Sequence, residues 1–72
     1  MKEYIYRMMD ERKDLSTKAC ALDRFLISTP IVLDDTEKHL MCEQLKFMYK
    51  YIEVLDARIS HAILKEQKED EK

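Results

Sequence analysis

Apolar residues recur between positions 41 and 62 in alternating steps of four and three. The row consists of Met41, Leu45, Met48, Ile52, Leu55, Ile59 and Ala62. An α-helix turns once in about 3.6 residues, so this spacing places the whole row on one side of a helix. In a strand the same residues would scatter over both faces. The pattern therefore predicts a helix with one continuous buried seam.

A second apolar face runs through residues 2–27. Its members, again at steps of three and four, are Ile5, Met8, Met9, Leu15, Ala19, Leu22, Phe25 and Leu26. Pro30 follows, and a proline lacks the amide hydrogen and disfavours the α conformation in the residue before it. The first helix should therefore end by Thr29.

The second helix begins with a capping signal. Asp34 precedes the apolar row, and Glu37 follows three residues later. Such a spacing lets Asp34 accept from a first-turn amide while Glu37 reaches back, as in a capping box. Between the two helices, Ile31, Val32 and Leu33 form a short apolar connector that is expected to fold over the open end.

Two helices of similar length joined by a short loop predict an all-α fold, a two-helix antiparallel hairpin. We assign residues 1–64 to the hairpin, with helix one at about 2–27, the loop at 28–34 and helix two at about 35–65. Residues 65–72 form a charged tail without an apolar side chain, either a fraying helical end or disordered.

One interface between two helices does not cover all the apolar residues. Further apolar or aromatic side chains flank the main seams: Ile5, Leu26, Leu40, Phe47, Tyr51, Val54 and Ile63. Exposed apolar patches of this kind call for a partner. We therefore expect copies of the hairpin to assemble as a homo-oligomeric helical bundle.

Composition argues against most other classes. The chain of 72 residues has no glycine and one proline, which excludes the glycine-rich loops that hold phosphates or dinucleotides. A net charge of −2 argues against DNA or RNA as a partner. No apolar run approaches the ~20 residues that span a bilayer. The first residues lack the apolar core of a signal peptide, so we expect a cytoplasmic protein without a membrane partner.

The sequence offers no candidate catalytic or metal-binding residues. His39 and His61 lie too far apart on one helix to meet within a chain, and no carboxylate pair stands out as acid and base. Cys20 and Cys42 match no zinc or redox spacing and are expected to serve as small apolar side chains. We expect no enzyme, no cofactor and no metal site.

Polar and aromatic residues border the seam of helix two at seven-residue intervals: Gln44, Tyr51 and Arg58. In an antiparallel hairpin the start of helix one lies near the end of helix two, so Arg7 is expected to approach Arg58. Guanidinium forks bind phosphate oxygens and phenolic rings stack on bases, which suits a phosphorylated aromatic ligand. The candidate ligand-binding residues are Arg7, Arg58, Tyr51, Gln44, Tyr4, Tyr6 and Lys18.

A structural interpretation of these residues stays open. Arg7 and Arg58 would then pair with Glu11, Glu3 or Asp56, and the tyrosines would cover the edge of the core. Periodicity also leaves open whether a pocket forms within one hairpin or between two.

The pattern resembles a family of small helical-hairpin proteins of tailed bacteriophages, including crAss-like phages. The matching residues are Tyr6, Arg7, Glu11, Leu15, Lys18, Leu22, Phe25, Leu33, Glu37, Leu40, Gln44, Met48, Tyr51, Leu55, Arg58 and Ile59. The chain is also similar in architecture to the anti-Thoeris and anti-CBASS sponges of phages, and to the Sequestin family.

The resemblance implies a phage anti-defence protein in the cytoplasm of the infected host. It would bind and sequester a nucleotide second messenger, a cyclic ADP-ribose isomer or a cyclic dinucleotide, without cleaving it. Arg7 and Arg58 would hold phosphates, the tyrosines would stack on the base, and Gln44 and Lys18 would contact polar edges. The alternative function is a helical module for protein–protein interaction or structural oligomerisation.

Overall fold

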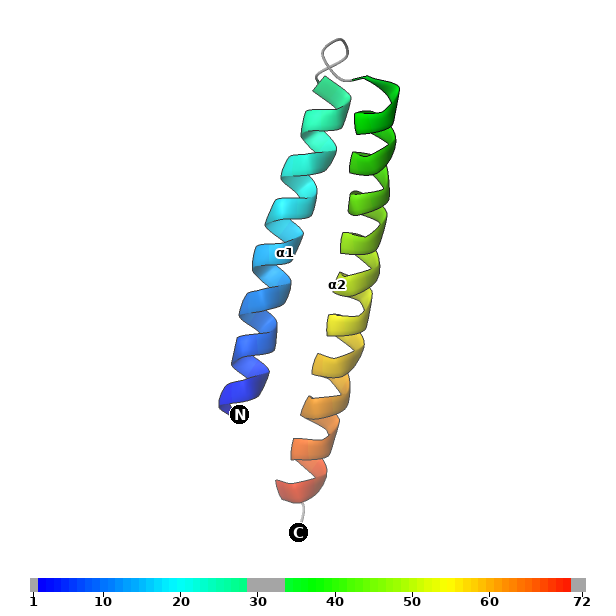
Figure 1. Ribbon diagram of the computed structural model, residues 1–72. Coiled ribbons are helices and arrows are strands. Elements are labelled where there is room, and N and C mark those ends of the chain that lie inside the picture. Colours follow the sequence, from blue (N-terminus) through cyan, green and yellow to red (C-terminus); the bar gives the residue numbers. More distant parts are fainter. Residues whose placement is uncertain (1, 29–33, 71–72) are drawn as a thin grey trace.

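Two long helices lie side by side and run in opposite directions (Figure 1). The computed structural model describes residues 2–28 and 34–70. Helix α1 spans Glu3–Ser28 and helix α2 spans Asp35–Asp70. The hairpin is a rod with extents of 59 × 15 × 14 Å. The predicted all-α antiparallel hairpin is confirmed, and its assembly into a homo-oligomer stays a prediction.

The second helix extends well into the charged tail. We expected it to reach about residue 65, and it continues to Asp70. The segment Lys65–Lys68 contains only lysine, glutamate and glutamine, which are good helix formers, and the chain has no glycine to stop the helix. The predicted helix end at Thr29 and the connector of Ile31, Val32 and Leu33 lie outside the described residues.

The start of α2 carries the predicted cap. The Asp34 carboxylate accepts a hydrogen bond of 2.7 Å from the backbone N–H of Glu37. The backbone carbonyl of Asp34 accepts a second bond, of 3.0 Å, from the N–H of Lys38. Acidic residues Asp35 and Glu37 occupy the first turn, where the helix dipole favours negative charge. The side-chain bond satisfies the Glu37 amide, which the helix itself leaves unpaired, and the bond to Lys38 is the first of the helix.

The core is a single seam between the helices. The buried apolar residues within the described chain are Ile5, Met8, Ala19, Leu55 and Ala62. All seven members of the predicted seam of α2 are buried or half-buried. Its counterpart on α1 is buried or half-buried except for Phe25, which is 41% exposed. Phe25 lies seven residues beyond Lys18, in the row of Tyr4, Glu11 and Lys18, which is exposed along its whole length at the edge of the seam.

Both cysteines differ from the expectation that they pack as small apolar side chains. Cys20 and Cys42 are free thiols and both are exposed. Each follows a buried or half-buried residue, Ala19 and Met41 respectively. One step along an α-helix turns the side chain by about 100°, which carries both thiols out of the seam.

The fully buried Leu55 gives a test of the seam. Replacing Leu55 with alanine leaves a cavity between the helices, and we expect a loss of about 2–5 kcal/mol in the free energy of unfolding. Leu64→Ala is the matched control, because Leu64 is 58% exposed on the same helix. Urea unfolding followed by circular dichroism at constant protein concentration measures both. Equal losses for the two variants would contradict the assigned seam.

Candidate functional site

One edge of the hairpin carries the polar row of α2 opposite a matching row of α1. Gln44, Tyr51 and Arg58 are seven residues apart on α2, and Tyr4 and Glu11 are seven apart on α1. Residues seven apart lie on nearly the same side of a helix. The hydroxyl of Tyr51 donates a hydrogen bond to the carboxylate of Glu11. Arg58 and Tyr4 line one hollow. The antiparallel arrangement therefore aligns the two rows.

The contact between Tyr51 and Glu11 changes the acidity of the phenol. Its pKa is raised above the ordinary value of 10.0, mainly because the neutral hydroxyl donates to the Glu11 carboxylate. The negative charge of Glu11 and burial add to the shift, while the positive charge of Arg58 opposes it. Tyr51 therefore stays protonated and is held by α1.

The larger of two hollows on this edge, the Glu11 hollow, has a volume of about 460 Å³. Its lining residues are Arg7, Asp10, Glu11, Asp14, Leu15, Lys18 and Tyr51. Three carboxylates outnumber two cationic groups there, which disfavours an anionic ligand. Arg7 also pairs with Glu3 at 2.9 Å, four residues away on the same helix. Both side chains are largely exposed, so this pair contributes little to stability.

A smaller hollow, the Arg58 hollow, has a volume of about 190 Å³. Its lining residues are Tyr4, Met8, Arg58, His61, Ala62 and Lys65. Met8 and Ala62 belong to the buried core and form an apolar floor. None of the lining residues is acidic. Arg58 makes no hydrogen bond or ion pair within residues 2–28 and 34–70. An unpaired guanidinium beside a phenol suits an anionic ligand with an aromatic ring.

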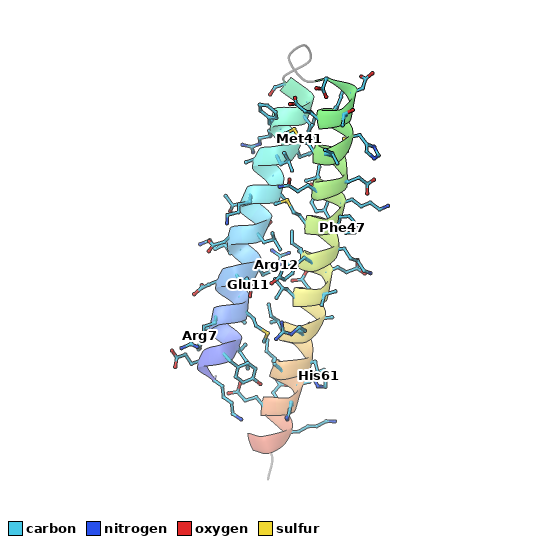
Figure 2. All side chains as sticks on the ribbon, viewed as in Figure 1. Arg7, Glu11, Arg12, Met41, Phe47 and His61 are labelled. Carbon is cyan, nitrogen blue, oxygen red and sulfur yellow. The ribbon has the colours of Figure 1, made fainter. Side chains whose placement is uncertain are left out.

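The two arginines expected to share one cleft line different hollows. The register of the hairpin pairs Arg58 with Tyr4 rather than with Arg7. Arg7 is three residues beyond Tyr4, which turns its side chain about 60° away from the direction of Tyr4 around α1. Figure 2 shows Arg7 on the side of α1 away from α2. Of the other candidates, Tyr51 and Lys18 line the Glu11 hollow. Gln44 and Tyr6 are exposed and line neither hollow.

Sequence reasoning missed His61 and Lys65, which line the Arg58 hollow. Their signal is spacing, because they follow Arg58 by three and seven residues and so lie on the same side of α2. The structural interpretation is borne out for Arg7, which pairs with Glu3. The same interpretation offered Asp56 as a partner of Arg7 or Arg58, but Asp56 pairs with Arg12.

The pair of Arg12 and Asp56 ties the two helices together. Arg12 Nε lies 2.7 Å from Asp56 Oδ1, and Nη2 lies 3.4 Å from Oδ2. The hydrogen bond to Asp56, and then its charge, hold the pKa of Arg12 above its usual value. Arg12 sits between Met8 and Leu15 in the alternating steps of the α1 seam, which was the overlooked signal. The contact lies across the hairpin, so the Asp56 carboxylate is engaged by a residue of α1.

Metal binding and membrane insertion find no support within the described ranges. No group of three or more histidine, cysteine, aspartate or glutamate side chains there is arranged to hold a metal ion. Neither α1 nor α2 contains a stretch long and apolar enough to cross a membrane.

Titration of Tyr51 tests the contact across the hairpin. Phenolate absorbance of the protein, minus that of Tyr51→Phe, should give a midpoint above pH 10.0. The hydrogen bond stabilises the fold fully below that pH and is lost as pH rises through the raised pKa. Glu11→Gln should bring the midpoint down, and Tyr49→Phe serves as the control for a phenol outside the contact. A Tyr51 midpoint at or below 10.0 with the helices intact would contradict the contact.

The comparison with known families agrees with the helical hairpin. Residues 2–61 match the family model described as Sequestin. No curated protein and no solved structure matches the chain. The matched range includes Tyr4, Tyr51 and Arg58, while Lys65 lies beyond it. The match supports a sequestering, anti-defence role and binding rather than catalysis. Most of the chain is covered by the match, and the protein therefore belongs to the Sequestin family.

Proposed function

We propose that this protein is a phage anti-defence factor that sequesters a nucleotide-derived immune signal in the cytoplasm of the infected bacterium. The ligand is a cyclic ADP-ribose isomer, as in Thoeris defence, or a cyclic dinucleotide, as in CBASS. Membership in the Sequestin family supports a sequestering role. Sequestration requires stoichiometric binding and no turnover, so the signal is held intact.

The guanidinium of Arg58, which has no hydrogen-bond or ion-pair partner within the described ranges 2–28 and 34–70, is the observation that carries this proposal. It lines a hollow without an acidic residue, next to the ring of Tyr4 and the side chain of Lys65. A guanidinium binds phosphate oxygens through two parallel hydrogen bonds. In the proposed complex Arg58 and Lys65 hold phosphate, His61 lies beside it, and Tyr4 stacks on a base.

The Glu11 hollow is a poorer place for phosphate despite its size. Binding an anion at Arg7 or Tyr51 would first require breaking their contacts with Glu3 and Glu11. The carboxylates left behind would then face the anion. We therefore assign phosphate binding to Arg58 and contacts with the base or ribose to Tyr51, Lys18 and Gln44. Arg7 and Tyr6 are left for parts of the ligand that extend along α1.

The Arg58 hollow holds only part of such a ligand. Its volume of about 190 Å³ is below the ~300–1,000 Å³ typical of small-molecule sites. The ligand must therefore extend along the edge toward Tyr51 or contact a second hairpin. Association of copies is accordingly part of the proposal, as the uncovered apolar residues of α2 also suggest.

A helical module for protein–protein interaction is the second candidate function. The observation that favours it is a row of exposed apolar side chains on α2, consisting of Leu40, Phe47 and Val54. An amphipathic helix of another protein could pack along such a row. Capture of a protein partner with no response to any nucleotide would favour this alternative.

Binding measurements with Arg58→Ala test the nucleotide proposal. A panel of cyclic ADP-ribose isomers and cyclic dinucleotides is screened by thermal shift, since a ligand of the folded state raises the melting temperature. Affinity for the ligand found, measured by calorimetry, should fall about 10- to 100-fold in Arg58→Ala, because hydrogen bonds to charged groups contribute ~1.5–3 kcal/mol. Arg24→Ala, on the exposed surface of α1, is the matched control and should bind normally.

The ligand recovered after denaturing the complex should be chemically intact by mass spectrometry. Recovery of a cleaved product would contradict sequestration. Unchanged affinity in Arg58→Ala would contradict the assigned site. A panel without any binder would remove the nucleotide proposal altogether.

A further inference from the structure

The outer side of α2 carries an apolar row that the hairpin leaves uncovered. Leu40, Phe47 and Val54 are 61%, 66% and 47% exposed. They are spaced by seven residues, so they form one stripe along the helix. Figure 2 shows Phe47 on the side of α2 away from α1. The stripe is therefore a second seam, separate from the one that packs against α1.

The accessible surface area of the hairpin is larger than that of a compact monomer of the same mass. A folded monomer of 8.7 kDa exposes about 4,700 Å² by the usual scaling with mass. This chain exposes 5935 Å², about 1,200 Å² more than that scaling gives. A typical stable interface buries about 800 Å² on each partner. The elongated shape accounts for a large exposed surface, and the excess exceeds the area that one partner buries in a typical interface.

Charges beside the row identify a second copy of this chain as the partner. When two copies of α2 pack antiparallel with Phe47 at the two-fold axis, Leu40 of one lies level with Val54 of the other. Glu43 then lies level with Tyr51 of the second copy and one residue, about 1.5 Å of axial rise, from its Lys50, within reach of that ammonium. The two-fold axis repeats this pair of opposite charges on the same flank of the row. Among residues 2–28 and 34–70, Lys50 pairs only with Glu53, at 3.6 Å, and both side chains are largely exposed, so the contact is weak.

We infer that Leu40, Phe47 and Val54 form the face on which a second copy packs, antiparallel and centred on Phe47. This inference rests on the association included in the proposed function and specifies its surface and register. The apolar pairs and the two pairs of opposite charge are satisfied together in this one register. Shifting the centre to lie between Phe47 and Val54 brings Lys50 of one copy within one residue of Lys50 of the other, and these like charges repel.

The same register brings a second copy to the ligand site. Thr36, in the first turn of α2 of the second copy, lies level with Arg58. His61 continues the seven-residue spacing of the apolar row and lines the Arg58 hollow. The second copy would thus enlarge a hollow that is too small for a whole nucleotide signal.

The mass in solution tests the inference. Light scattering after size exclusion should give a multiple of 8.7 kDa for the unaltered chain and a smaller mass for Phe47→Glu, which places charges at the axis. Ile27→Glu is the control, because Ile27 is 75% exposed on α1. An unaltered chain that is monomeric would overturn association itself. An assembly that survives Phe47→Glu would overturn only the assigned face.

Charge exchange and crosslinking test the register. Glu43→Lys alone should weaken the assembly, and Glu43→Lys with Lys50→Glu should restore it. With Cys20 and Cys42 replaced by serine, a mixture of Leu40→Cys and Val54→Cys chains should form a mixed disulfide. A disulfide between two Leu40→Cys chains instead would mean parallel packing and would overturn the proposed register.

Discussion

A single seam between α1 and α2 holds this protein together. Each helix alone would be marginal in water, because isolated helices gain little from their own hydrogen bonds. Burial of Leu55 against α1, and of Ile5 and Met8 against α2, supplies most of the remaining stability. Every functional feature follows from the register of this seam. It decides which residue of α1 stands opposite each polar residue of α2.

The placement of the carboxylates distinguishes the two hollows. Both hollows contain a guanidinium and a phenol, so residue type alone does not separate them. In one hollow the phenol of Tyr51 is already engaged by Glu11. In the other, no acidic residue lines the hollow, and Arg58 makes no hydrogen bond or ion pair within residues 2–28 and 34–70. An acidic chain thereby presents a local basic site, even though its net charge is −2.

Local patterns were sufficient to predict the helices, the seam of α2 and the cap at Asp34. Each depends on residues within a turn or two of one another. The contacts of Arg12 and Arg58 were beyond such patterns, because they depend on the axial offset between the helices. Arg7 instead pairs with Glu3, four residues away on its own helix, which is a local spacing. Arg12 could have been noticed, since it occupies a place in the α1 seam. The grouping of Arg58 with Tyr4 rather than Arg7 required the structure.

So thin a core makes the lifetime of the hairpin sensitive to what it binds. A molecule that associates only with the folded form reduces the unfolded fraction, and with it the fraction open to proteases. For a small rod with few buried side chains, this reduction is proportionally large. Intact protein would accumulate in cells where its target is abundant and be degraded where it is scarce. The amount of the protein would then rise with the amount of its target, without a separate regulatory element.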